Sequence, residues 1–121
     1  MNFTFKSIRT FIGSKDFQIS RQFYQKLGFE EIIIDAKMSY FKVNDNLGFY
    51  LQDYYVKDWV NNSMIFLEVE NIEKCYQTII QKELDKHFKD VRITDIKDEA
   101  WGSVFFVHDP VGVLWHFGCF K

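Results

Sequence analysis

The sequence predicts a single α+β domain, residues 1–121, made of two βαβββ modules (about 1–53 and about 63–121) that form a cupped mixed sheet. Three observations support this fold class. The length of 121 residues suits one compact domain with a real core. Apolar patterns with strand and helix periods follow one another in the same order twice along the chain. Asp109-Pro110-Val111-Gly112 is a turn pattern between two aromatic-rich runs, which predicts a terminal hairpin.

The first module begins with an alternating pattern over residues 3–14, which predicts a strand with two different faces. Asp16 is then placed to cap the start of a helix, and Gly28 to end it. Apolar side chains recur at helical spacing between the two caps. Three further strands are expected at 29–35, 38–43 and 47–52.

The second module follows a loose connection over residues 54–62. A strand is expected at 64–69, and Asn71 caps a helix that extends through Leu84. Strands at 91–96, 101–108 and 113–120 complete the second βαβββ order. Each module then has one sheet face covered by its helix and one open face, which is the candidate site. Alternation places Arg9 and Phe11 on the open face, and also His116 if Trp115 and Phe117 face the helix.

Composition excludes several classes of function. The formal net charge of −2 and the lack of a basic patch argue against nucleic-acid binding. No apolar run is long enough to span a bilayer, so no membrane partner is expected. The first residues lack the pattern of a secretory signal, which favours a cytoplasmic protein. Cys75 and Cys119 are too few for a disulfide framework.

The aromatic content is high: 14 Phe, 6 Tyr and 3 Trp make 19% of the chain. A small core accounts for most of these rings but does not need all of them. We therefore expect some to line a ligand cavity.

Two short motifs stand at matching places in this duplicated pattern: the helix end Phe23-Tyr24-Gln25-Lys26-Leu27-Gly28-Phe29 and the closing segment from Asp109 to Trp115. Together with the βαβββ order they resemble the vicinal oxygen chelate superfamily over essentially the whole chain. That superfamily includes glyoxalase I, bleomycin resistance proteins, fosfomycin-resistance enzymes and extradiol dioxygenases. The resemblance is greatest to the metal-free bleomycin resistance type, although Val111 and Val113 replace the polar residues common in that turn. It implies a homodimer whose cups are completed by both subunits.

The resemblance also permits a test for a metal. The metalloenzymes of the superfamily place His and Glu or Gln on the first and last strand of each module. The corresponding residues here are Arg9, Tyr50, Met64 and His116, of which only His116 is a metal ligand. We therefore expect no metal and no other cofactor.

These considerations predict a protein that binds an aromatic or drug-like small molecule and sequesters it without turnover. The predicted ligand-binding residues are Arg9, Phe11, Tyr50, Trp59, Met64, Trp101 and His116. Arg9 would clamp an acidic group or form an internal salt bridge, and the two tryptophans would stack on ligand rings or pack at an interface. Two alternatives stay open. One is a lyase, isomerase or dioxygenase relative with rearranged metal ligands or with His116 as acid or base, and the other is a module that binds another protein.

Overall fold

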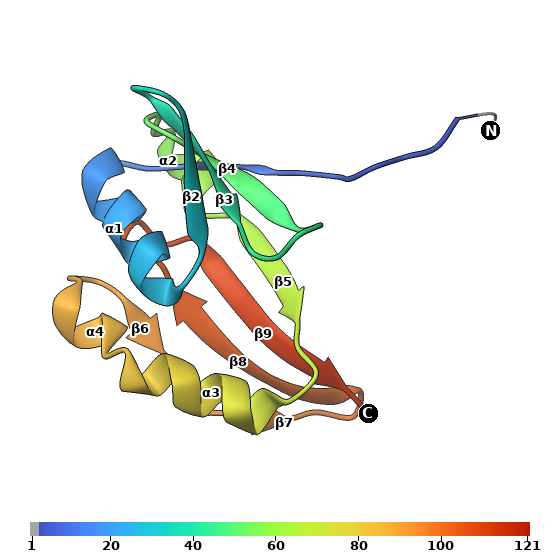
Figure 1. The fold of residues 1–121 in the computed structure, drawn as a ribbon. Helices are drawn as coiled ribbons and strands as arrows, with labels where there is room; N and C mark the ends of the chain where they lie inside the picture. The colour runs from blue at the N-terminus through green and yellow to red at the C-terminus, as the bar shows by residue number, and fades with distance from the viewer. Residues whose placement is uncertain (1–2) are drawn as a thin grey trace.

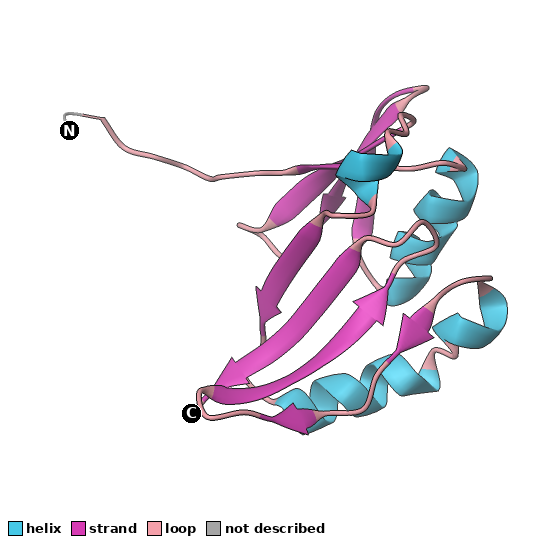
Figure 2. Cartoon of the chain, turned by 180° about the vertical axis from the view of Figure 1, so that it is seen from behind, coloured by secondary structure: helices cyan, strands magenta, loops and turns pink. Residues whose placement is uncertain are grey.

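The computed structural model describes residues 3–121, which form two sheets with helices packed on one side (Figures 1 and 2). The first sheet contains β1 (Phe11–Gly13), β2 (Glu30–Asp35), β3 (Met38–Lys42) and β4 (Gly48–Gln52). The second contains β5 (Met64–Glu68), β6 (Arg92–Ile93), β7 (Lys97–Asp98), β8 (Gly102–His108) and β9 (Leu114–Phe120). The helices are α1 (Phe17–Leu27), α2 (Lys57–Val60), α3 (Ile72–Gln81) and α4 (Leu84–His87).

The two sheets have equivalent topologies. The first has the order β1-β4-β3-β2, and the second has the order β5-β9-β8-β6, with β7 also paired to β8. In each sheet the first strand runs parallel to the last one, and the remaining pairs are antiparallel. This arrangement confirms the expected α+β class, and the mixed sheet expected from the two modules consists of two mixed sheets, one from each module.

Local signals in the sequence explain where the main helices begin. The Asp16 carboxylate accepts a hydrogen bond from the Ile19 amide at 3.2 Å, and the Asn71 side chain accepts one from the Lys74 amide at 3.0 Å. Gly28 ends α1 with φ 115°, a left-handed conformation that favours glycine. None of the helices in residues 3–121 is long and apolar enough to cross a membrane.

The structure corrects four expected elements. The strand expected over residues 3–14 pairs only at Phe11–Gly13, because β4 begins at Gly48 and offers no partner for most of the preceding residues. The expected connection contains the short helix α2, and the strand expected at 91–96 is reduced to β6, with β7 beyond it. The second helix does not continue through Leu84, because Glu83 adopts a left-handed conformation with φ 53° and separates α3 from α4.

The turn between β8 and β9 is built around a buried carboxylate. Oδ1 of Asp109 accepts hydrogen bonds from the amides of Val111, Gly112 and Val113 at 3.0, 2.9 and 2.8 Å. Oδ2 accepts a bond of 2.7 Å from the Tyr24 hydroxyl, which in turn accepts one of 3.0 Å from Nε1 of Trp115. The turn motif predicted from the sequence therefore also connects α1 to the second sheet.

One apolar core runs between the helices and both sheets. Phe23, Tyr24 and Phe41 come from the first half of the chain, and Phe105 and Trp115 from the second, and none is more than 1% exposed. Trp115 and Phe117 point into this core, so His116 lies on the opposite face of β9. The strand phase expected for His116 is confirmed.

Candidate functional site

A cleft of about 670 Å³ opens between the first sheet and β5. We call it the open-face cleft. Its walls come from the segment before β1, from the turn and start of β4, from β5 and from β9. It is lined by Ile8, Arg9, Thr10, Val43, Leu47, Gly48, Phe49, Ile65, Phe66, Leu67, Glu68 and Trp115. A volume of this size suits an organic ligand of ordinary size.

One side of the cleft carries an arginine on a platform of aromatic rings. Nη1 of Arg9 donates a hydrogen bond of 2.9 Å to the Tyr50 hydroxyl, and its guanidinium lies 4.4 Å from the centre of the Tyr40 ring. The Phe11 ring stacks on Tyr50 at 4.9 Å. The register explains this cluster, because Tyr50 is paired with Phe11 on one side and with Tyr40 on the other.

Arg9 has no acidic partner in this structure. The salt bridges found in residues 3–121 do not include it. The hydrogen bond to Tyr50 raises the pKa of Arg9, which keeps the guanidinium charged. Only Nη1 is engaged in a hydrogen bond, so the remaining N–H donors face solvent and are available to an acidic group of a ligand.

The open face of the second sheet carries another aromatic cluster. Phe66 lies 6.2 Å from His116, 5.9 Å from Trp101 and 5.7 Å from Phe120, measured between ring centres. Phe106 contacts His116 edge-on at 4.8 Å. His116 is paired with Phe66 on β5 and with Phe106 on β8, which places all three rings on one face.

His116 lies in an apolar environment. Its Nε2 atom is buried and has no hydrogen-bond partner among the described residues. Burial lowers the pKa of His116, so the imidazole is neutral at pH 7. His116 is therefore an uncharged member of the aromatic cluster, and its unpaired ring nitrogen is covered by its neighbours.

The residues predicted from sequence separate into two groups and one outlier. Arg9, Phe11 and Tyr50 form the cluster on the first sheet. Met64, Trp101 and His116 lie on or beside the open face of the second sheet, where Met64 is 65% exposed. Trp59 lies apart from both groups: it packs over Gly13, where an added Cβ would lie 2.6 Å from the indole ring.

Sequence reasoning missed four aromatic residues of these clusters: Tyr40, Phe66, Phe106 and Phe120. The alternation of exposed and buried residues in their strands carried a usable signal. Phe66 is two residues after Met64, and Phe120 is four residues after His116, so each shares a face with a predicted residue. Tyr40 required the strand register, which the sequence does not contain.

The side chains at the family's metal positions do not fit a metal ion. Arg9 and Tyr50 bond to each other, Met64 lies on a different sheet, and only His116 offers a nitrogen ligand. Residues 3–121 contain no group of three His, Cys, Asp or Glu side chains arranged to hold a metal.

Comparison with known proteins places this architecture among solved structures. No protein-family profile matches the sequence, and no curated protein matches it. The bleomycin-binding protein of Streptomyces verticillus, solved with copper(II)-bleomycin, has a TM-score of 0.80 at 17% identity and covers 98% of this chain and 99% of its own.

Two other structures show the same similarity. The bleomycin resistance determinant encoded on transposon Tn5 has a TM-score of 0.70 at 19% identity, over 95% of this chain and 98% of its own. An antibiotic-binding protein from Streptomyces sp. CB03234 has a TM-score of 0.75 at 12% identity, over 100% of this chain and 99% of its own. At these identities the comparison establishes the fold that the sequence motifs had indicated.

Proposed function

We propose that this chain, which has the fold of the bleomycin resistance proteins in the vicinal oxygen chelate superfamily, is a metal-free protein that sequesters an aromatic or drug-like molecule in the open-face cleft. The observation that carries this proposal is Arg9, charged, stacked on Tyr40, and without an acidic partner, at the edge of a cleft of about 670 Å³. Three structures with this fold are described as proteins that bind bleomycin, resist it, or bind an antibiotic. Their ligands support a binding role for this cleft.

The chemistry of the cleft favours a planar ligand with polar substituents. Rings of the ligand would stack against the tyrosine platform on one side and against Phe66 on the other. Arg9 would bind an acidic or carbonyl oxygen of the ligand. Glu68 also lines the cleft and would select against a ligand with a second acidic group close to β5.

A second copy of the chain would complete the site. The segment before β1 leaves the body of the protein as an extended arm (Figure 1), and its side chains Phe3, Phe5 and Ile8 are 65%, 68% and 98% exposed. Met64 and Phe120 are also more than half exposed on the open face of the second sheet. Burial of these apolar surfaces between two copies would stabilise a symmetric dimer.

Two measurements test the proposal. Native mass spectrometry of the protein as purified reports subunit number, metal content and any retained small molecule. A metal-free dimer is the expected result. One metal ion per subunit would contradict the metal-free site and favour the enzyme alternative.

The second measurement is fluorescence titration with anilinonaphthalene sulfonate, a planar aromatic anion. Arg9→Gln removes the charged donors and should weaken binding by about tenfold. Trp101→Ala should weaken binding by several-fold at most, because it removes one ring at the edge of the cluster. Tyr55→Ala is the matched control: it removes an aromatic ring outside the cleft and should leave the affinity unchanged. Wild-type affinity in both Arg9→Gln and Trp101→Ala would refute the assignment of this cleft.

A further inference from the structure

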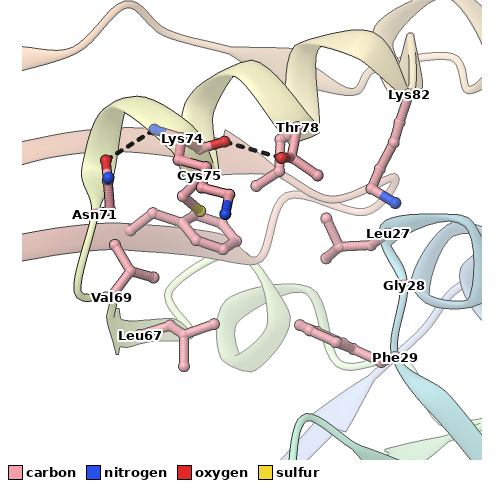
Figure 3. A pocket seen from close by; sticks show the side chains of 12 residues that line it. Leu27, Gly28, Phe29, Leu67, Val69, Asn71, Lys74, Cys75, Thr78 and Lys82 are labelled. Carbon is pink, nitrogen blue, oxygen red and sulfur yellow. Dashed lines mark hydrogen bonds between the residues drawn. The ribbon is translucent and has the colours of Figure 1, made fainter.

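A second pocket lies on the helix side of the molecule, away from the open faces. It has a volume of about 510 Å³ and is bounded by the end of α1 and the two residues after it, by β5 and the segment that follows it, and by one face of α3 (Figure 3). Leu27, Phe29, Leu67 and Val69 contribute apolar side chains. Of the residues that line the two cavities, only Leu67 is common to both. The pocket is therefore separate from the cleft of the proposed function.

Two lysines from the same helix segment border this pocket. Figure 3 shows the side chains of Lys74 and Lys82 extending from α3 and its C-terminal end toward the pocket, with Lys82 reaching over Leu27 and Gly28. The salt bridges found in residues 3–121 include neither lysine. Eight residues of helix separate them, which corresponds to about 12 Å along the axis.

Lys82 is the better placed of the two to hold an anionic group. It is half-buried, whereas Lys74 is exposed. Within residues 3–121 no carboxylate is close enough to pair with its ammonium group, and its Nζ atom lies 3.5 Å from the position that a Cβ on Gly28 would occupy. An ammonium group without a counter-ion beside an apolar wall can form a charge-assisted hydrogen bond with the acidic head of a ligand that binds there.

From this combination of an apolar wall and an unpaired ammonium group at its edge, we infer that the pocket binds an anionic amphiphile with a single acidic head, such as a medium-chain fatty acid. The carboxylate pairs with Lys82, and the alkyl chain lies along Phe29, Leu67 and Val69 toward Asn71. Burial of each methylene contributes about 0.8 kcal/mol. This binding site does not depend on the proposed function of the open-face cleft.

Cys75 provides a direct reporter of occupancy. It lines the pocket and is half-buried, while Cys119 is on β9 and does not line it. Burial raises the pKa of the Cys75 thiol, so alkylation is best measured at alkaline pH. Dodecanoate should slow alkylation of Cys75 by iodoacetamide at least fivefold and leave Cys119 unchanged. The two cysteines are thus matched probes in one molecule.

The decisive experiment combines this protection assay with calorimetric titration of dodecanoate below the concentration at which it forms micelles. We expect one dodecanoate per chain, and affinity about tenfold lower in Lys82→Gln. Dodecanol, which has the same chain without the charge, should bind more weakly than dodecanoate. Lys26→Gln removes a neighbouring lysine that does not line the pocket, and it should bind as the wild type does.

Three results would overturn the inference. They are the absence of dodecanoate binding, binding that Lys82→Gln does not weaken, or binding that leaves Cys75 alkylation unchanged. Thr78→Trp offers a second test, because its side chain lies on the exposed surface of α3 and would fill the pocket without disturbing the core. A folded Thr78→Trp protein that binds dodecanoate with wild-type affinity would also exclude this site. Arg9→Gln should not alter dodecanoate binding, whatever becomes of the open-face cleft.

Discussion

Replacing Tyr24 with Phe should cost more stability than the loss of a typical hydroxyl group. The Tyr24 hydroxyl donates to Oδ2 of Asp109 at 2.7 Å and accepts from Nε1 of Trp115 at 3.0 Å. All three side chains are at most 1% exposed, so water cannot replace the lost bonds. Each buried polar atom left without a partner costs about 1–3 kcal/mol, so the two atoms orphaned here give about 2–6 kcal/mol for the substitution.

The cost of Tyr24→Phe should also depend on pH. Burial raises the pKa of Asp109 from 3.8 to about 6, and the hydrogen bond from Tyr24 partly opposes this rise. Because the pKa of Asp109 is higher in the folded protein than in the unfolded chain, the folded state is favoured when this carboxyl is protonated. The contribution of Asp109 to the free energy of unfolding is therefore complete below pH 3.8 and is lost as the pH rises through 6. That interval corresponds to about 3 kcal/mol. Without Tyr24 the pKa of Asp109 rises further, so the variant loses more stability at pH 7.5 than at pH 4.5.

Urea unfolding at these two pH values measures both effects, and the melting temperature at pH 7.5 should fall by about 8–24 °C. Tyr76→Phe is the matched control, because the Tyr76 hydroxyl donates to Asp95 at the surface and its loss should cost under about 1 kcal/mol. The reasoning is refuted if Tyr24→Phe costs no more than Tyr76→Phe, or if its cost is the same at both pH values.

Three other substitutions test separate parts of the fold. Glu31 accepts hydrogen bonds from Arg21, Ser39 and Gln25, and the bond from Arg21 is the main reason that its pKa is lowered to about 2. The contribution of Glu31 to stability is present above pH 4.5 and is lost as the pH falls toward 2, and it amounts to about 1–2 kcal/mol after solvent screening. In Glu31→Gln the free energy of unfolding should therefore fall less steeply between pH 4.5 and pH 2 than in the wild type. The same steepness in both proteins would contradict this. Gly102→Ala should destabilise the protein by at least about 2 kcal/mol in thermal unfolding, because the new Cβ would collide with the backbone carbonyl of Cys119. A variant as stable as the wild type would show that β8 and β9 can separate to make room for it. Asp90 is exposed and has φ 67°, a left-handed conformation that glycine adopts more easily than aspartate, so Asp90→Gly should stabilise the protein by about 0.5 kcal/mol. A loss of stability would show that the Asp90 side chain has an unrecognised partner.

Much of the fold follows from local signals that the sequence contains. Asp16, Gly28 and Asn71 mark helix ends through caps that need only neighbouring amides. The turn at Pro110 is also local, and strand alternation correctly assigned Trp115 and His116 to opposite faces. These features could be predicted because each depends on residues within a few positions of one another.

The errors arose where a local pattern needed a distant partner. Residues 3–10 have the alternation of a strand, but a strand requires a neighbour, and β4 supplies one only from Gly48 onward. The buried hydrogen-bond network joins Tyr24 to Asp109, which is 85 positions away, and to Trp115, which is 91 positions away. No motif in the sequence connects these residues. Trp59 was grouped with the ligand-binding aromatics because its loop resembles the one that carries ligand-contacting aromatics in bleomycin resistance proteins. The structure packs it over Gly13, and its part in binding stays a prediction.

The sequence by itself determined the order of the main strands and helices, the duplicated topology and the side-chain types available for binding. Only the tertiary structure decided that Arg9 rests on Tyr40, that Phe66 joins His116, and that Lys82 borders an apolar pocket between α1 and α3. The physical reason is that secondary structure depends on hydrogen bonds and side-chain periods within short segments. A site depends instead on strand register and on packing between segments that are distant along the chain.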